Sequence, residues 1–394
     1  MTRPPRTLAA ALVVLALQGA LILRPAPASA QTDPHLDRAL RVLSSTPLID
    51  GHNDLPWAIR GSDVAPHDVH AEEHDLRGDT PFHTNIPRLR EGRVGAQYWS
   101  VYIPHGAVEE GAAKTQLEQI DIAHQIIEKY PDVFELALDA SDVERIFAAG
   151  KIASLLGIEG GHAIENSLGA LRAFHGLGVR YMTLTHNGTI DWADSAADTA
   201  RHDGLTAFGR EVVREMNRLG MLVDLSHTSP ATMNDALDTS EAPVIWSHAS
   251  ANGVHEHTRN VPDQVLRRLP ENGGVVMVTF VPSFVSPGDE ATLADVADHI
   301  DHIANLAGVD HVGIGSDFDG ISSTPAGLED PSTFPALFAE LSRRGWTEDQ
   351  LAKLAGENML RVMREAEAAA RRIQRESRPS VLTIEELDGG SDGG

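Results

Sequence analysis

The feature that most constrains the fold of this chain is an alternation of short apolar runs with longer amphipathic stretches. Eight runs are rich in β-branched residues and have the length of strands; they cover residues 46–52, 96–103, 152–159, 181–186, 221–227, 243–248, 274–280 and 311–317. Stretches with a helical spacing of apolar residues lie between most of them, at 116–130, 168–177, 206–219, 293–306 and 335–344. This alternation is typical of βα units and a mostly parallel sheet. Eight strands in one continuous array predict a closed (β/α)8 barrel of the TIM type.

The two ends of the chain differ from this array. Arg3 and Arg6 precede an apolar run over residues 8–23, and a small-residue cleavage pattern follows at residues 28–30. These features predict a signal peptide over 1–30 and a secreted protein, and an uncleaved membrane anchor is the alternative. Residues 31–375 are then expected to form a single catalytic domain. The polar segment 376–394, which ends in Gly-Gly-Ser-Asp-Gly-Gly, is expected to be a disordered tail.

Charge and composition exclude several classes of function. The formal net charge of −25 argues against nucleic acid as a partner, because a phosphate-binding protein needs a basic face. The chain has no cysteine, so disulfides and thiolate metal ligands are both excluded. A metal ion would have to be held by histidine and carboxylate side chains, and 19 histidines are available.

Ionisable side chains recur where the expected strands end. They are His52, Asp54, Glu159, His186, His227, His248 and Asp317. In a (β/α)8 barrel the C-terminal ends of the strands open onto one face, so these side chains are expected to converge there. Their crowding would be unfavourable unless a cation coordinated and neutralised them. The sequence therefore predicts a metal centre at the mouth of the barrel.

The residue types in this set favour two zinc ions per chain. His52 and Asp54 are two residues apart in an extended segment, which places them on one face. Glu159 carries two carboxylate oxygens and can bridge two cations, while His227 and His248 each follow a serine at a strand end. Imidazole and carboxylate ligands without thiolate suit zinc, with manganese or cobalt as substitutes. None of the four lysines ends a strand, so a carboxylated lysine cannot take the bridging position.

The chain resembles the membrane dipeptidase (renal dipeptidase) family of the amidohydrolase superfamily over about residues 45–365. The resemblance rests on IDGHNDLPW at 49–57, GIEGGH at 157–162, LTHN at 184–187, VDLSH at 223–227, the strand around 247–250, RNVP at 259–262 and GSDFDG at 315–320. It implies one zinc site made by His52, Asp54 and Glu159. It implies a second zinc site made by Glu159, His227 and His248.

By the same resemblance, His186, Arg259 and Asp317 face a dipeptide substrate. Water activated by the two zinc ions attacks the peptide carbonyl, and one zinc ion with His186 stabilises the oxyanion. Asp317 acts as general base and then general acid, although a helix N-cap is its alternative role. Arg259 clamps the terminal carboxylate of the substrate, which would favour dipeptides over longer chains, and a plain surface arginine is the alternative.

Some properties of the family do not carry over, and some histidines are not expected to act. Animal members are disulfide-linked and lipid-anchored, whereas this chain has no cysteine and a polar tail, so we expect no stable membrane anchor once the signal peptide is cleaved. A homodimer is expected from the resemblance alone. His255 and His257 are expected to be loop residues, and His162 a residue at a helix start rather than a ligand.

Three other functions remain open at this stage. The same metal site could hydrolyse lactones, phosphoesters, N-acyl amino acids or β-lactam-like amides, since the fold does not fix the substrate. A deaminase would normally use one metal, which the bridging role of Glu159 disfavours. A secreted binding protein would have no need of the proton-transfer residues His186 and Asp317. The sequence does not reveal which side chains a dipeptide carries or whether its C-terminal residue can be a D-amino acid.

Overall fold

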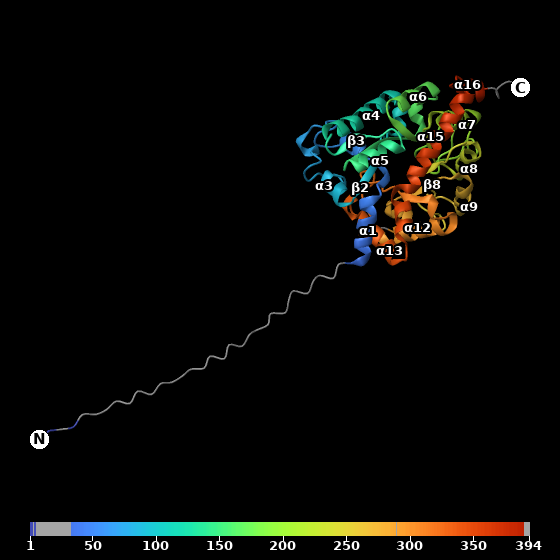
Figure 1. Ribbon diagram of the computed structural model, residues 1–394. Coiled ribbons are helices and arrows are strands. Elements are labelled where there is room, and N and C mark those ends of the chain that lie inside the picture. Colours follow the sequence, from blue (N-terminus) through green and yellow to red (C-terminus); the bar gives the residue numbers. More distant parts are fainter. Residues whose placement is uncertain (3, 5–32, 289, 390–394) are drawn as a thin grey trace. The chain divides into compact units, whose positions relative to one another are not determined.

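The structure, a computed structural model, describes residues 1, 2, 4, 33–288 and 290–389. Nearly all of the expected signal peptide lies outside these residues, as do residues 390–394 of the expected tail. The ribbon of the described part begins with helix α1 (Pro34–Ser45) in blue and ends with helix α16 (Ile384–Leu387) in red (Figure 1).

A ring of parallel strands forms the centre of the domain. The strands are β1 (Leu48–Asn53), β2 (Val94–Ser100), β3 (Phe134–Leu136), β4 (Ile152–Glu159), β5 (Val179–Thr183), β6 (Leu222–Asp224), β7 (Ile245–Ala249), β8 (Val275–Val278) and β9 (Val312–Ile314). β1 pairs with both β2 and β9, and β2 pairs with β4, so that every strand except β3 belongs to a closed ring. The expectation of a (β/α)8 barrel is confirmed, and each of the eight expected runs contains part of one barrel strand.

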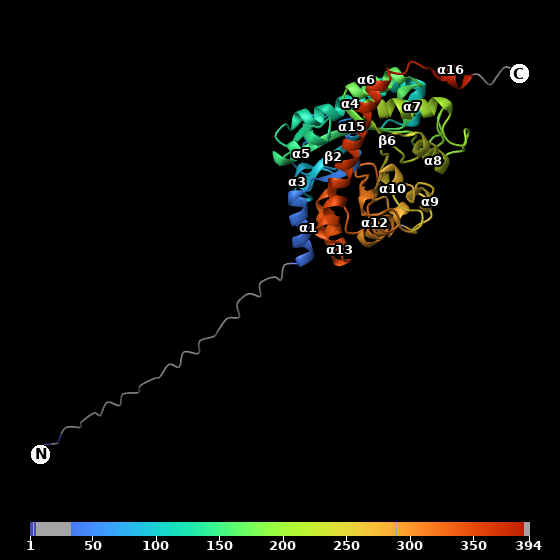
Figure 2. The same ribbon diagram turned by 45° about the vertical axis from the view of Figure 1, so that its right-hand side comes forward.

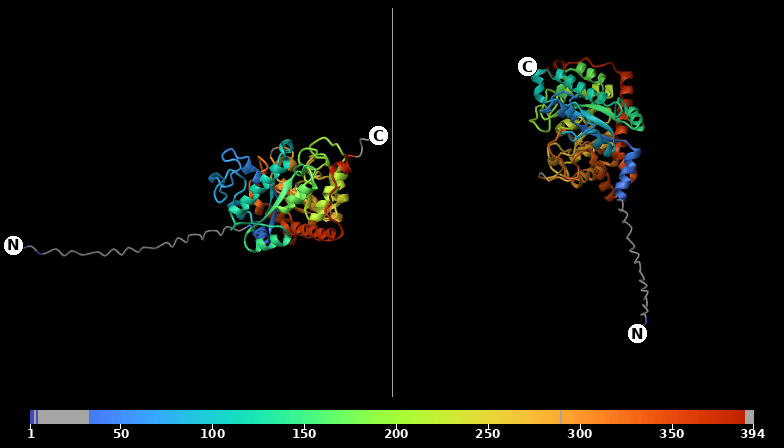
Figure 3. Two further views of the ribbon diagram at one scale, coloured as in Figure 1. Left: turned by 90° about the horizontal axis from the view of Figure 1, so that it is seen from above. Right: turned by 90° about the vertical axis from the view of Figure 1, so that its left-hand side faces the viewer.

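Helices cover the outside of the ring, while the strands lie in the interior (Figure 3). They are α2 (Leu55–Arg60), α3 (Ile86–Glu91), α4 (Ala112–Lys129), α5 (Ala140–Ala148), α6 (Leu168–Gly176), α7 (Ala207–Leu219), α8 (Pro230–Thr239), α9 (Asp263–Leu266), α10 (Leu269–Asn272), α11 (Pro282–Val285), α12 (Leu293–Ala307), α13 (Phe334–Arg343), α14 (Glu348–Ala352) and α15 (Asn358–Glu376), besides α1 and α16. Every residue of β1, β2 and β4 is buried. Parallel strands read as continuous apolar runs because helices and the barrel interior bury both of their faces.

Helix α7 illustrates how the sequence builds this outer layer. The Thr206 side chain caps the first turn by accepting a backbone hydrogen bond. The helix ends at Leu219 and is followed by Gly220, whose φ of 77° is a conformation that glycine adopts readily. The helix buries Phe208, Val212 and Met216 on one face. This spacing gives an apolar stripe that packs on the core.

Two parts of the structure differ from the expectations. β3 is an additional strand that pairs with the first half of β4, whereas β5 pairs with the second half. The three residues of β3 are too few to show a strand pattern in the sequence. The tail from 376 is not disordered over its described part: α16 follows the end of α15, and Figure 2 shows both in red near α7. The carboxylate of Asp388 accepts hydrogen bonds from Thr206 and from the backbone of Phe208, and these contacts hold the segment in place.

Within the described residues, no helix has both the length and the apolar character that crossing a membrane requires.

Candidate active site

A pocket of about 410 Å³ opens where the barrel strands end. Its lining consists of Asp54, Trp57, Tyr102, Glu159, His186, Asn187, His227, Arg259, Val281, Phe284, Asp317, Gly320 and Ile321. Six of the eight residues that the sequence singled out are among them. The other two, His52 and His248, lie directly beneath and contact Glu159. The structure therefore brings all eight candidate residues together.

The candidates reach this pocket from strands and from the segments that follow them. His52, Glu159 and His248 belong to β1, β4 and β7, and Asp54 follows β1 directly. The sequence placed His186, His227 and Asp317 at strand ends, but β5, β6 and β9 each stop three residues earlier. Arg259 lies in the loop between β7 and α9. No described helix begins at Asp317, so a role as helix N-cap is ruled out.

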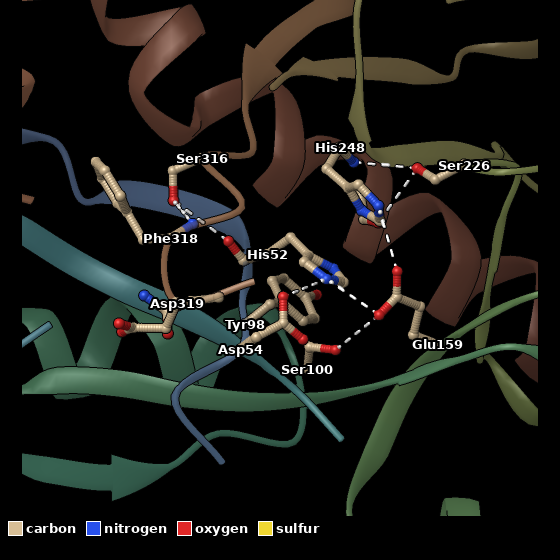
Figure 4. Close-up of polar contacts among 12 residues, drawn as sticks. His52, Asp54, Tyr98, Ser100, Glu159, Ser226, His248, Ser316, Phe318 and Asp319 are labelled. Carbon is tan, nitrogen blue, oxygen red and sulfur yellow. Dashed lines mark hydrogen bonds and ion pairs between the residues drawn. The ribbon is translucent and has the colours of Figure 1, made fainter. Parts of the chain in front are cut away.

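Glu159 occupies the middle of the cluster, and its two oxygens face different residues. Oε2 lies 3.5 Å from His52 Nε2, which is itself 3.2 Å from Asp54 Oδ2. Oε1 lies 3.0 Å from His227 Nε2 and 3.4 Å from His248 Nε2. Figure 4 shows the carboxylate of Glu159 between His52 and His248. One carboxylate thus joins two sets of side chains.

The three central imidazoles are each oriented by a contact of their other ring nitrogen. Nδ1 of His52 lies 2.9 Å from the Tyr181 hydroxyl, and Nδ1 of His227 lies 3.0 Å from Asn187 Oδ1. Nδ1 of His248 lies 2.9 Å from an oxygen as well, Oγ of the preceding serine. An amide oxygen can only accept, so His227 carries its proton on Nδ1. Outer contacts of this kind orient histidine ligands in metal sites and select their tautomer.

Several inner nitrogens and oxygens of the cluster are poorly placed as hydrogen-bonding partners of one another. Nε2 of His227 and Nε2 of His248 face each other at 3.0 Å. Buried Nε2 of His52 and Oδ1 of Asp54 have no hydrogen-bond partner among the described residues. Lone pairs directed at one another in a buried site are unfavourable unless a cation lies between them. The donor set, three imidazoles and two carboxylates, fits zinc.

Burial and charge set the protonation of these groups. Burial holds the pKa values of His227 and His248 well below the ordinary value, so both rings are neutral and can act as ligands. Burial opposes ionisation of Glu159, but His52 and His186 hold its pKa well below the usual range. Burial raises the pKa of Asp317 well above its ordinary value. The carboxylates of Asp54 and Glu159 add to that rise.

Arg259 presents a buried cation to the pocket. Its side chain belongs to a residue that is only 4% exposed, and Nε and Nη1 have no hydrogen-bond partner among the described residues. Burial lowers the pKa of the guanidinium to about 10, so it remains charged near neutral pH. The Phe284 ring lies beneath it, 5.3 Å from ring centroid to Cζ. An unpaired buried guanidinium in a pocket is a binding site for an anionic group.

Several residues of the site escaped the sequence analysis. Asn187 and Trp57 stand in segments that resemble the family, yet neither type of side chain signals a role by itself. Tyr102 falls at the end of an expected strand, and burial together with Glu159 and Asp54 raises its pKa to about 12. Phe284 has no signal in the sequence, because its contact with Arg259 joins helix α11 to the loop between β7 and α9.

The other histidines take the places expected of them. His162 lies in a short 3₁₀ helix, Gly161–Ile164, and its Nε2 contacts the backbone oxygen of Ile103. Burial lowers the pKa of His162 to about 4. His257 lies in the loop before Arg259, and its Nδ1 accepts the backbone N–H of that residue. None of these side chains belongs to the cluster around Glu159.

A (β/α)8 barrel with histidine and carboxylate side chains clustered at its mouth defines the class of amidohydrolase-type metallohydrolases. The particular family follows from comparison with known proteins. The membrane dipeptidase family (peptidase family M19) matches residues 36–377. The chain therefore belongs to this family of metal-dependent dipeptidases.

Solved structures of similar proteins agree with this assignment. A dipeptidase of family M19 is 29% identical, with a TM-score of 0.74 over 82% of this chain and 98% of that one. A metallopeptidase from Rhodobacter sphaeroides, liganded with a phosphinate mimic of the dipeptide L-Ala-D-Ala, is 28% identical, with a TM-score of 0.72 over 82% and 99%. An amidohydrolase from Pseudomonas aeruginosa is 26% identical, with a TM-score of 0.71 over 83% and 98%.

Proposed function

We propose that this protein is a binuclear zinc dipeptidase that cleaves the peptide bond of free dipeptides. The observation that carries the proposal is the position of Glu159, whose two oxygens face two separate ligand sets. His52, Asp54 and Glu159 would hold one ion. Glu159, His227 and His248 would hold the other. When bound, a pair of zinc ions makes water nucleophilic near neutral pH and polarises a carbonyl group.

Arg259 would recognise the free carboxylate of the substrate. Its Nε and Nη1 are buried and have no hydrogen-bond partner among the described residues, so the guanidinium can donate charged hydrogen bonds to a carboxylate. Phe284 packs against the guanidinium and fixes the plane in which the pair forms. A longer peptide would place a neutral amide there and leave the cation without a partner. This contact explains a preference for dipeptides.

Asp317 and His186 would handle the charge and the protons of the reaction. Asp317 lines the same pocket, and burial raises the pKa of its carboxyl group. A raised pKa suits a carboxylate that accepts a proton from water and returns it to the leaving amine. His186 lies with Nε2 3.7 Å from Glu159 Oε1 and would donate a hydrogen bond to the developing oxyanion.

Three finer properties belong to the same proposal. The relative from Rhodobacter sphaeroides binds a mimic of L-Ala-D-Ala, which supports acceptance of a D-residue at the C-terminal position. The basic and apolar N-terminal segment supports export with cleavage after residue 30. Dimer formation is proposed from the family alone. N-terminal sequencing of the exported protein and sedimentation of the purified protein test the last two.

A dipeptide library tests the function directly. The zinc-loaded protein is incubated with dipeptides that carry L- or D-residues at both positions, and released amino acids are quantified. We expect cleavage of free dipeptides, and at least a 100-fold loss of kcat/KM when a third residue extends the C-terminus, since about 3 kcal/mol of charged pairing is removed. N-acyl amino acids and lactones serve as competing substrates. Preferred cleavage of either, with no activity on dipeptides, would refute the proposal.

A further inference from the structure

Two fully buried aspartates lie outside the candidate active site. Asp50 of β1 and Asp224 of β6 are both fully buried, with no exposed surface. Among the described residues, neither carboxylate forms a salt bridge with lysine or arginine. Burial of an unpaired carboxylate is unfavourable unless hydrogen bonds to the charged form compensate for it.

Both aspartates make the same set of contacts to a serine, which lies in β7 for Asp224 and just after β9 for Asp50. Asp50 Oδ1 accepts the backbone N–H of Ser316 at 2.8 Å, and its Oδ2 accepts the Ser316 hydroxyl at 2.7 Å. Asp224 Oδ1 accepts the backbone N–H of Ser247 at 2.8 Å, and its Oδ2 accepts the Ser247 hydroxyl at 2.6 Å. We call these the β1/β9 clasp (Asp50 and Ser316) and the β6/β7 clasp (Asp224 and Ser247).

Each clasp also reaches the strand on its other side. Oδ2 of Asp50 accepts from Gln97 of β2, and Oδ2 of Asp224 accepts from Thr183 of β5. Oδ1 of each aspartate lies near the backbone N–H two residues further on, at 3.5 Å for Asp50 and 3.1 Å for Asp224. The same arrangement therefore ties β2, β1 and the segment after β9 together, and likewise β5, β6 and β7.

The clasps anchor residues that directly precede members of the candidate site. Ser316 precedes Asp317, and Ser247 precedes His248. Asp224 also holds the N–H of Ser226, the residue before His227. Asp317 and His227 have φ values of 69° and 67°. This left-handed conformation is strained by about 1–3 kcal/mol for residues other than glycine, and it persists only where the surroundings enforce it.

The hydroxyl oxygens of the two serines accept hydrogen bonds from different groups. Because the Ser247 hydroxyl donates to Asp224, its oxygen accepts from Nδ1–H of His248 at 2.9 Å. This order of donors leaves Nε2 of His248 without a proton, directed at Glu159. Ser316 has no imidazole beside it, and its oxygen instead accepts the backbone N–H of Phe318, on the far side of Asp317 (Figure 4).

We infer that Asp50 and Asp224 are positioning residues with separate tasks: the β6/β7 clasp selects the metal-binding tautomer of His248, and the β1/β9 clasp fixes the backbone that presents Asp317. The inference rests on the proposed zinc dipeptidase function. Neither aspartate touches the substrate pocket itself, so each acts through its serine.

Isosteric substitutions separate the two tasks. In Asp224→Asn, an amide NH2 group stands where the carboxylate oxygen accepted the Ser247 hydroxyl. The hydroxyl is then free to donate to His248 Nδ1, which favours the tautomer with the proton on Nε2. Calorimetric zinc titration of the metal-free variant should show that the second zinc ion binds 10–100-fold more weakly than in wild type. This is the range typical of lost contacts to a metal ligand's outer nitrogen. Asp50→Asn should bind both ions as wild type does, yet lose 10–100-fold in kcat with KM within about threefold.

Serine variants provide the second comparison and guard against loss of folding. Ser247→Ala should weaken binding of the second zinc ion, whereas Ser316→Ala should not. Thermal unfolding of the metal-free proteins reports whether each variant is folded. The inference would be overturned by an equal loss of zinc affinity in Asp50→Asn and Asp224→Asn, or in Ser316→Ala and Ser247→Ala. Wild-type zinc affinity in both Asp224→Asn and Ser247→Ala would also overturn it. A failure of the proposed function shows separately, because wild type itself would then bind fewer than two ions or cleave no dipeptide.

Discussion

At the scale of single residues, the site depends on groups that each serve more than one partner. Glu159 faces two sets of side chains, and every central imidazole has one nitrogen held by an outer partner and the other directed inward. Such sites tolerate little change, because a shift of one side chain moves several others. Substitution effects should therefore appear in metal binding before they appear in folding.

Glu159→Ala should abolish most of the binuclear occupancy. Both proposed ligand sets lose their shared carboxylate, whose Oε1 lies within 3.4 Å of the facing nitrogens of His227 and His248. Metal analysis after exhaustive dialysis against dilute zinc is the measurement, and we expect two ions in wild type and one or fewer in the variant. Glu165→Ala, which changes an exposed glutamate of the loop that follows, is the matched control and should keep both ions. Two tightly held ions in Glu159→Ala would disprove the bridging role.

Arg259→Ala should raise KM more than it lowers kcat, because the carboxylate contact exists in both the ground state and the transition state. We expect a loss of about 2–4 kcal/mol in kcat/KM. Amidation of the dipeptide should impose a similar loss on wild type and little further loss on the variant. Arg201→Ala, whose guanidinium bonds the backbone of Thr189 in another pocket, controls for the loss of a positive charge. Equal cleavage of acid and amide by wild type would rule out the clamp.

At this scale the sequence could predict which residues gather at the site, but not the contacts that orient them. His52, Glu159 and His248 are recognisable because ionisable residues at the ends of apolar runs are unusual. The contact of His52 with Tyr181 joins residues 129 positions apart. Because Tyr181 stands in an apolar run, the sequence alone is equally consistent with a tyrosine that only packs in the core. Contacts of this kind depend on strand order and register, which no local pattern encodes.

At the scale of elements, the period of the sequence predicted the barrel well and the boundaries of its strands less well. The expected runs ending at His186, His227 and Asp317 continue three residues past β5, β6 and β9. Leu184 and Leu225 prolong the apolar pattern past two of these strands, and the polar residues that follow do not mark where strand pairing stops. In the structure these segments turn away from the ladder, and His227 and Asp317 adopt left-handed backbone that a strand cannot contain.

Helix α12 offers a test of how packing between elements responds to pH. His299 on this helix bonds the backbone oxygen of Val285 through Nε2 and the backbone N–H of Ala251 through Nδ1. Burial lowers the pKa of His299 to about 4. The unfolded chain, with an ordinary pKa of about 6.5, then binds more protons below that pH, so stability is full above pH 6.5 and falls as pH drops towards 4.

Lowering the pH from 7 to 5 should therefore cost about 2 kcal/mol of folding free energy at His299 alone. Urea unfolding of the metal-free protein at both pH values measures this, and His299→Gln should show a correspondingly smaller drop. His302→Gln is the matched control, because His302 lies on the same helix but is only partly buried and contacts Asp263. An unchanged drop in His299→Gln would show that another group controls the acid sensitivity.

At the scale of the whole molecule, a scaffold with buried strands presents one polar mouth to small substrates. Arg259 lines the pocket together with Asp54, Glu159 and Asp317, so under the proposed function the pocket would select a substrate whose carboxylate reaches this guanidinium. The chain has no cysteine, and the nucleophile of the proposed reaction is water. Reagents that modify thiols should consequently leave the activity intact, whereas chelators should remove it.

The most direct test of the account is a zinc titration of the metal-free protein in which bound zinc and dipeptide cleavage are measured on the same samples. We predict no cleavage without metal, two ions bound per chain at saturation, and activity that rises with occupancy of the second ion. Reconstitution after chelation should restore the full rate. Full activity of the metal-free protein, or saturation and full activity at one ion per chain, would contradict the binuclear mechanism built around Glu159.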